Sequence, residues 1–493
     1  MQALRLICVV FQFDVIEQDA VEILSLIRSW RNRSAPISRI PPEILALVPD
    51  FWGKFERNKS IIALTHVCRA WRELFVSQSS FWTDLDCVGT DKTRVYLQRS
   101  KSSPINLILY RNQEVDLPPR DPFFQITPHA IGRLKSLFIH VASWDLENVT
   151  NHLSHPAPLL EDMRIDSNGY PGTEDNPVLE PTLFNGDLSS LRELCLGSVD
   201  TELPWRNMAN LTSLMLTHTS ISVRQFLDFF ESAPRLYEVG LYSATPTSGA
   251  EGDRLVSLTC LKRMRIEGGP ASALLNHLLI PVGTRLAIEV DLSNHSIGGR
   301  PPKFFDNLRN LPNFTKVRLT SDGRRSRMRL TGLNGSVLMS RMSSRVDEIH
   351  FSLESLAQFD TSDIERLDIS FCDFPSNISP HKVFLPMKNL CALSLNLCKN
   401  PRVFIHALDP GMNPSRVVAC PKLEELALDI GDHDLTDAIV SMASGRVLRG
   451  AKLRTFRIVG RRSSRGLSQA GLGKHVSQLE YCGMFPRVDD EEY

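Results

Sequence analysis

The sequence has little cysteine, no excess of charge of either sign and no long apolar run. Its 10 cysteines among 493 residues include no CxxC pair, which indicates free thiols in a reducing compartment rather than a disulfide framework. Lys and Arg together number 56, and so do Asp and Glu, whereas general nucleic-acid binders carry a basic excess. No uncharged apolar stretch reaches the roughly 18 residues of a membrane span. We therefore expect a protein of the cytoplasm, the nucleus or both, with no nucleic-acid or membrane partner.

Motifs of the common enzyme classes are missing as well. The chain contains no G-x-S-x-G, no P-loop and no H-E-x-x-H. Two clusters of charged residues are each interpreted as a solvated loop: Asp429, Asp432, His433, Asp434 and Asp437, where acidic residues also serve as helix caps, and Arg324, Arg325, Arg327 and Arg329. We expect no cofactor, no metal ion and no catalytic activity.

Residues 1–36 are predicted to form an N-terminal helical segment and a linker. Val15, Ile16, Ile23, Leu24 and Ile27 recur at helical spacing, and a basic linker with one proline follows from Arg28 to Ser38. A signal peptide is the alternative for the apolar run near the start, but no basic region precedes that run and no small-residue cleavage site follows it.

Residues 37–85 have the pattern of a small helical unit. Pro41 and Pro42 suit a helix start, where a missing N–H costs nothing. Ser60 can cap a second helix, and one apolar stripe then runs along four turns through Ile61, Leu64, Cys68, Trp71 and Phe75. A unit this small buries little surface alone, so we expect it to pack on a partner or a neighbouring domain.

From residue 105 the pattern becomes L-x-x-L-x-L, with apolar residues at positions 1, 4 and 6. The first positions are 134, 160, 191, 211, 236, 261, 287, 314, 346, 364, 390, 423 and 453. A proline lies two residues before several of these motifs, at Pro158, Pro234, Pro312 and Pro421, where it can end a helix. Cys372 and Cys398 occupy position 9, where leucine-rich repeats carry Asn or Cys. We interpret residues 105–480 as an irregular leucine-rich-repeat solenoid of the α/β class, with a non-repetitive α/β domain as the alternative.

The segment from Ile40 to Trp82 resembles an F-box. The resemblance is carried by Ile40-Pro41-Pro42-Glu43-Ile44-Leu45, by Leu64-Thr65-His66-Val67-Cys68-Arg69-Ala70-Trp71-Arg72 and by Phe81-Trp82. With the leucine-rich region that follows, the chain is similar to the expanded F-box families of fungi. The expected domains are therefore 1–36, an F-box at 37–85, a connector at 86–104, the repeats at 105–480 and an acidic tail at 481–493.

The resemblance implies a function without chemistry of its own. F-box proteins bind a Skp-type adaptor, which docks on a cullin scaffold with a RING subunit, and they hold a protein substrate near the ubiquitin-charged enzyme. The implied adaptor-binding residues are Pro41, Pro42, Glu43, Ile44, Leu45, Leu64, Val67, Cys68, Trp71 and Trp82. The alternative is a leucine-rich interaction scaffold whose F-box has decayed.

The repeats predict where a protein substrate would bind. Side chains alternate along a strand, so positions 3, 5 and 7 should point to the open face of the sheet. On that face we expect a locally basic patch made of Arg263, Arg265, Lys316, Arg318 and Arg366, which would contact an acidic stretch of substrate. The competing interpretation is that these residues pair with Glu238, Glu289 and Glu348 on neighbouring strands.

Overall fold

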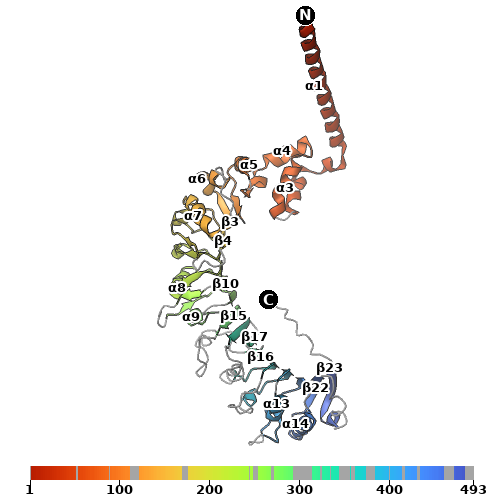
Figure 1. Ribbon diagram of the computed structural model, residues 1–493, viewed down its shortest axis with the longest axis vertical. Helices are drawn as coiled ribbons and strands as arrows, with labels where there is room; N and C mark the ends of the chain where they lie inside the picture. The colour runs from red at the N-terminus through yellow and green to blue at the C-terminus, as the bar shows by residue number, and fades with distance from the viewer. Residues whose placement is uncertain are drawn as a thin grey trace. The chain divides into compact units, whose positions relative to one another are not determined.

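The computed structural model has mixed α/β content, with helices in the N-terminal part and a large sheet after them (Figure 1). It describes residues 2–51, 54–87, 89–111, 122–168, 176–243, 245–247, 254–267, 271–281, 283–291, 314–321, 325–332, 335–342, 356, 361–372, 383–398, 400–412, 417–429, 434–459 and 471–482. The chain divides into two compact units. Unit 1 is Met1–Gly172 with Pro181–Ser190, and unit 2 is Thr173–Glu180 with Leu191–Tyr493.

The N-terminal helix α1 (Gln2–Ser34) confirms the helix predicted for this region. It continues through the basic stretch from Arg28, where the sequence predicted a linker. Arginine is a good helix former, and Arg31 and Arg33 lie in the last turn, where the helix dipole favours cations. The chain leaves the helix only before Pro36, which begins the 3-10 turn η1 (Pro36–Arg39).

Residues 36–82 form what we call the helical segment, which consists of η1 and five further short elements. They are α2 (Pro42–Leu45), η2 (Val48–Phe51), α3 (Lys54–Leu64), α4 (Arg69–Ser77) and η3 (Ser79–Trp82). Pro42 occupies the first turn of α2, as predicted.

The single long helix predicted from Ile61 to Phe75 is wrong. Helix α3 begins at Lys54 rather than after Ser60 and ends at Leu64, and Cys68 is extended (φ −160°) before α4 begins. The Thr65 hydroxyl donates to the Ile62 carbonyl at 2.7 Å, a local bond that competes with helix propagation. Arg72 Nε then donates to the Thr65 carbonyl at 2.9 Å, which satisfies one acceptor at the helix end.

In unit 1, four parallel strands follow the helical segment in the order β1–β2–β3–β4. They are β1 (Asp84–Leu85), β2 (Ile105–Tyr110), β3 (Leu134–Ala142) and β4 (Asp162–Asn168). The helices and turns between and after them are α5 (Thr90–Ser100), η4 (Phe123–Gln125), α6 (Pro128–Ile131), α7 (Ser143–His152) and η5 (Leu183–Gly186).

The helical segment packs on a neighbouring element, as expected for so small a unit. The ring of Tyr96 on α5 meets Trp82 edge-on at 4.9 Å, and the Arg99 guanidinium lies 4.3 Å from the Trp82 ring centre. The Asn58 amide donates to the Asp84 carbonyl on β1 at 2.9 Å. Helix α5, which lies in the predicted connector, therefore closes the core of the helical segment.

Unit 2 contains the main run of strands, in the order β6–β8–β10–β13–β15–β18–β17–β16–β19–β20–β21–β22–β23. Their bounds are β6 (Glu193–Gly197), β8 (Ser213–Thr217), β10 (Glu238–Tyr242), β13 (Arg263–Glu267), β15 (Arg285–Asp291), β16 (Phe314–Ser321), β17 (Arg325–Gly332), β18 (Gly335–Met342), β19 (Arg366–Ser370), β20 (Ala392–Asn396), β21 (Glu425–Asp429), β22 (Leu453–Val459) and β23 (Val476–Cys482).

Shorter elements connect these strands. Three small parallel pairs are β5 (Val178–Leu179) with β7 (Asp200–Thr201), β9 (Ser220–Ser222) with β11 (Thr245–Thr247), and β12 (Val256–Ser257) with β14 (Leu278–Leu279). The helices and turns are η6 (Trp205–Asn207), α8 (Val223–Ser232), α9 (Ala271–Leu275), α13 (Pro401–Leu408), α14 (Thr436–Leu448) and η8 (Leu472–Lys474). Ser222 and Gln225 form a capping box at the start of α8.

The pairing of the strands follows the predicted motif positions. Position 4 pairs with position 4 through Leu194, Leu214, Val239 and Met264, and again through Val317, Leu367, Leu393, Leu426 and Phe456. Positions 4 and 6 are buried throughout these strands, whereas positions 3 and 5 are mostly half-buried or exposed. The alternation predicted for these strands is confirmed.

The motif predicted to start at Ala287 is wrong in register. Met264 and Ile266 pair with Leu286 and Ile288, not with Val290 and Leu292. The shift is an even number of residues, so every side chain keeps its face of the sheet, but Arg285 rather than Glu289 comes to lie beside Arg263. The motif predicted at 346 lies outside the described residues.

An antiparallel insertion interrupts the parallel run. Strand β16 pairs with β17, and β17 with β18, both antiparallel, while β18 pairs with β15 and β16 with β19 in parallel. The run from Arg325 to Arg329, predicted as a solvated loop, therefore lies in strand β17. Within it Met328 and Leu330 are buried, and this alternation of apolar and basic residues is the strand signal that the basic run obscured.

A common turn follows many of the strands. Ser198, His218, Ser243, Phe371 and Leu397, each directly after a strand, all have φ between 50° and 57°. In four of them the N–H donates to the carbonyl that ends the next strand, as from His218 to Tyr242 at 2.8 Å and from Phe371 to Asn396 at 2.9 Å. The similarity among these strands thus includes both their apolar positions and the backbone conformation that follows them.

The nine described cysteines from Cys68 to Cys482 are free thiols. The thiols of Cys372 and Cys398 donate to the carbonyls two residues earlier, at 3.3 Å and 3.7 Å, which places them in the turn after the strand as predicted. Burial raises the pKa of Cys420 to about 12, so this thiol stays neutral and unreactive near pH 7. Among the described residues, no helix combines the length and apolar character that crossing a membrane requires.

Candidate functional site

The ten residues that the resemblance implied for adaptor binding do not form one surface. Pro41, Pro42, Glu43, Ile44 and Val67 are exposed, Cys68 is half-buried, and Leu45, Leu64, Trp71 and Trp82 are buried. Half of the set therefore offers contact surface, and most of the rest holds the helices in place.

Two buried members, Trp71 and Trp82, belong to an aromatic core with Phe75 and Phe81. Trp71 lies 5.9 Å from Phe75, ring centre to ring centre, and Phe75 lies 5.2 Å from Phe81. Trp82 Nε1 donates to the Phe75 carbonyl at 2.8 Å, so its one polar atom is satisfied inside. These contacts account for the burial of Trp71 and Trp82, whose roles are therefore internal to the helical segment.

One exposed member, Ile44, belongs to a run of exposed apolar residues. We call Ile37, Ile40, Ile44, Leu47 and Phe51 the N-terminal apolar surface; all five are exposed, Ile44 at 54% and Phe51 at 86%. They succeed one another along the tight turns η1, α2 and η2, where backbone bonds such as Leu47 N–H to the Ile44 carbonyl (3.1 Å) fix the chain. Large exposed apolar side chains gathered on one short segment are typical of a protein-binding site.

The predicted adaptor-binding residues included only Ile44 of these five. Ile37 fell in the predicted linker from Arg28 to Ser38, and Phe51 was assigned no role. The run of apolar residues at 37, 40, 44, 47 and 51 has helical spacing of three and four, and that spacing was the available signal.

The five residues of the predicted basic patch fall into two groups. Arg263 and Arg265 lie on β13, whereas Lys316 and Arg318 lie on β16 and Arg366 on β19, with β15, β18 and β17 between the groups. At about 4.8 Å per strand, these intervening strands place the groups roughly 19 Å apart along the sheet. The single patch predicted from the sequence is therefore wrong, because the antiparallel insertion was not foreseen.

Ion pairs neutralise part of the first group. Arg263 Nη1 lies 3.7 Å from Glu238 Oε2 on the adjacent strand, one of the pairs that the competing interpretation expected. Arg265 instead pairs with Glu267 on its own strand, and its guanidinium lies 5.4 Å from the Tyr242 ring centre.

The second group is also paired in part. Arg366 Nε lies 3.6 Å from Asp368 Oδ2 on its own strand. Lys316 and Arg366 are directly opposite each other across β16 and β19, and Arg318 is opposite Arg329 across β16 and β17.

A hollow of about 810 Å³ opens on the sheet face over β8, β10, β13, β15 and the β17–β18 turn. Its lining residues are Met215, Glu238, Val239, Gly240, Tyr242, Arg263, Met264, Arg265, Arg285, Leu286, Ala287, Thr331, Gly332, Gly335 and Ser336. The volume is in the range of ligand pockets, about 300–1,000 Å³. Only Arg263 and Arg265 of the predicted patch line it, and Arg285 joins them through the corrected register.

Two glycines shape this hollow. A Cβ on Gly240 would lie 2.9 Å from Tyr242 Cε2, so the absent side chain leaves room for the ring. A Cβ on Gly335 would lie 2.4 Å from the Leu286 carbonyl oxygen, so only glycine lets β18 approach β15 this closely.

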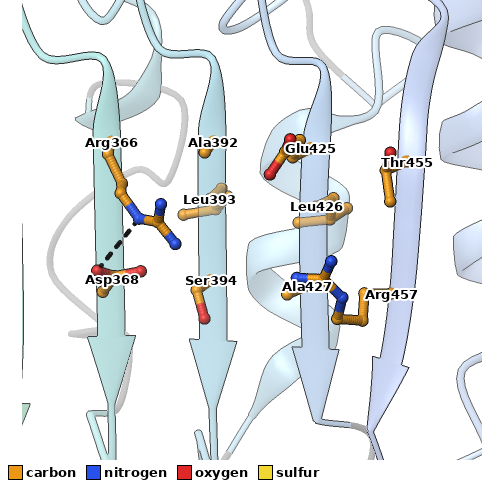
Figure 2. Close-up of a pocket in the computed structure, with 10 residues that line it drawn as sticks. All are labelled: Arg366, Asp368, Ala392, Leu393, Ser394, Glu425, Leu426, Ala427, Thr455 and Arg457. Atoms are coloured by element: carbon orange, nitrogen blue, oxygen red, sulfur yellow. Dashed lines mark ion pairs between the residues drawn. The ribbon is translucent and has the colours of Figure 1, made fainter. Parts of the chain in front are cut away.

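A much smaller hollow, of about 40 Å³, lies over β19 to β22. Figure 2 shows Arg366 and Arg457 on the outer strands and the short side chains of Ser394 and Ala427 between them. Arg457 Nε bonds Glu480 at 2.8 Å, and this bond raises the pKa of Arg457. With both arginines paired and room for only a few water molecules, this hollow is a gap between side chains rather than a binding pocket.

The described part of the chain contains no cluster of His, Cys, Asp and Glu that could hold a metal ion. Of the acidic group near residue 434, Asp432 and His433 lie outside the described residues. Asp434 Oδ1 accepts the Thr436 N–H at 3.2 Å at the start of α14, and this bond lowers the pKa of Asp434. Asp434 precedes the N-cap residue Leu435 and satisfies the first N–H of the helix, so it supports the helix start without being the N-cap.

Comparison with known proteins adds no identification: no protein-family model matches the chain, and no curated protein matches its sequence.

Proposed function

We propose that this protein is a substrate-recruiting F-box subunit of a cullin–RING ubiquitin ligase. The N-terminal apolar surface binds a Skp-type adaptor, and the sheet of unit 2, an irregular leucine-rich-repeat solenoid, holds a protein substrate. The protein itself carries out no chemistry. It raises the concentration of the substrate near the ubiquitin-charged enzyme.

The observation that carries the proposal is the exposed apolar surface on a segment whose core residues match the F-box pattern. Residues that resemble the motif divide into a buried aromatic core and an exposed rim, the division that a small docking domain requires. The recurrent strand register and the shared turn after the strands support the repeat interpretation of unit 2.

The test replaces Ile44, Leu47 and Phe51 by serine and measures recovery of the adaptor and cullin in a pull-down. Because all three side chains are exposed, we expect unfolding at the wild-type temperature but at least about tenfold less adaptor, since three lost apolar contacts exceed 1.4 kcal/mol. Leu45 is unsuitable for this test, because it is 7% exposed and its truncation would disturb the fold.

The matched control replaces Leu159, Leu255 and Leu448, which are exposed apolar residues elsewhere, by serine. The control should recover the adaptor fully. Equal recovery by both triple variants would contradict the assignment of the surface. If the wild-type chain recovers no adaptor at all, the protein is an interaction scaffold without a ligase role.

A further inference from the structure

We infer that the hollow over β8 to β15 binds an extended peptide segment in which an acidic residue adjoins an apolar one. Arg263 and Arg285 are the clamp for the carboxylate. The inference rests on the proposed function in one respect: it names the kind of segment by which the sheet holds its protein substrate.

The clamp follows from the register of β13 and β15. Arg263 and Arg285 are Cα partners on adjacent parallel strands, both exposed, and both line the hollow. Like charges placed directly opposite each other repel. Among the described residues, Arg263 has one long ion pair, at 3.7 Å to Glu238, and Arg285 has none. A carboxylate that lies between the two guanidinium groups removes the repulsion and gains charge-assisted hydrogen bonds.

The floor of the hollow leaves room for a chain that crosses the strands. Gly240, Arg265, Ala287 and Ser336 form one row from β10 to β18. Ala287 and Ser336 contribute small side chains to this row, whereas Arg265, which also lines the hollow, is held in an ion pair with Glu267 and lies beside the Tyr242 ring. The hollow, about 810 Å³ in volume, therefore has small side chains on β15 and β18 next to Arg285, where a peptide segment can lie.

The apolar side chain of the peptide would bind beside the two arginines, against Met215 and Tyr242. Met215 is the Cα partner of Gly240, and its side chain is exposed, while the Tyr242 ring fills the space above Gly240. A methionine and an aromatic ring adapt to many apolar groups, and Tyr also offers a hydroxyl to the peptide backbone.

A protein segment fits this surface better than a nucleic acid does. Glu238 lines the hollow beside Arg263, and Glu267 lies four residues further along β13, so a polyanion that extends beyond the clamp would meet negative charge. The chain as a whole has no basic excess.

The experiment uses the purified full chain with ¹³C-labelled methionine methyl groups and no adaptor, so its result is independent of whether the F-box functions. The probe is the peptide Gly-Ser-Phe-Glu-Ser-Gly, compared with the same peptide carrying Gln. We expect the Met215 methyl signal to shift with the Glu peptide and about tenfold weaker binding of the Gln peptide, the loss of one charge-assisted bond.

Arg285→Glu separates binding from folding. In this variant Arg263 faces a carboxylate across the strands, so the melting temperature should be equal to or higher than that of the wild type. Affinity for the Glu peptide should nevertheless fall at least about tenfold.

The matched control is Lys316→Glu, which makes the same kind of opposite-charge pair with Arg366 but lies outside the hollow. It should leave peptide binding unchanged. The inference is overturned if Met215 does not respond to the Glu peptide, or if Lys316→Glu weakens binding as much as Arg285→Glu. It is also overturned if N-acetylglutamate amide alone binds as tightly as the peptide, or if single-stranded DNA binds more tightly.

Discussion

The helical segment and the sheet of unit 2 differ in how many of their large apolar side chains are exposed. In residues 36–82 large apolar side chains remain outside, with Phe51 the most exposed, although an aromatic core is complete beneath them. In the strands from β6 to β22 that carry the motif, the apolar side chains at positions 4 and 6 are buried; an exception to apolar burial is Met215 in β8, which occupies position 5 and is 37% exposed. The exception lies in the hollow for which we infer a ligand.

The difference has a geometric cause. A strand alternates its side chains between two faces, so one face can be apolar throughout and the other polar. Helix α2 has four residues, little more than one turn, and neighbouring residues such as Ile44 and Leu45 point about 100° apart. Leu45 therefore reaches the core, whereas Ile44 points away from it. Ile44 can be buried only if a partner covers it.

The largest effect is expected from Trp71→Ala, which should unfold the helical segment and leave the sheet of unit 2 folded. Truncating Trp71 to alanine removes a buried ring from the aromatic core and should cost about 3–5 kcal/mol. Hydrogen exchange should show lost protection in residues 54–85 and unchanged protection in the strands of unit 2.

Trp30→Ala is the control, because this tryptophan on α1 is exposed and its loss should change little. Protection that persists in residues 54–85 of the Trp71 variant would contradict the role assigned to the core.

A second variant, Arg446→Ala, should destabilise unit 2 and leave the helical segment unchanged. Arg446 on α14 is fully buried, and its Nη1 and Nη2 donate to the carbonyls of Ala419 and Cys420, each at 2.8 Å. Arg446→Ala leaves both carbonyls without their donor and should cost roughly 3 kcal/mol in unit 2. Arg446→Lys should restore little, because an ammonium cannot reproduce the two-pronged bond.

The free energy of unfolding is measured by chemical denaturation, with hydrogen exchange of the α14 amides as the probe. Arg454→Ala is the control, because Arg454 is exposed. A variant at Arg446 as stable as this control would mean that the buried guanidinium does not support the fold.

The smallest expected effect concerns the turn after the strands. Leu397 has φ 50°, a conformation that asparagine tolerates better than leucine, and its side chain is half exposed. Leu397→Asn should therefore stabilise unit 2 by about 0.5 kcal/mol. The same substitution at Leu255, where φ is not positive, should not stabilise. A loss of stability at Leu397 would show that its apolar contacts outweigh the backbone strain.

Part of this structure was predictable because it depends on neighbours in the sequence. The spacing of leucines predicted the strands and their buried positions, and it predicted the pairing of Leu214 with Val239 and of Leu393 with Leu426. It could not choose the register of β15. Leu286, Ile288 and Val290 alternate without interruption, so a slip by an even number of residues keeps the same side chains buried.

The sequence alone determined the α/β content, the apolar periodicity of the strands and the aromatic residues of the helical segment. Those properties depend on the chemistry of residues a few positions apart. Only the tertiary structure decided that Leu45 is buried and Ile44 exposed, that the insertion of β17 and β18 divides the basic residues, and that Arg285 lies beside Arg263. Each of these depends on which distant strand or helix packs alongside, and that choice is made by the whole core rather than by any local pattern.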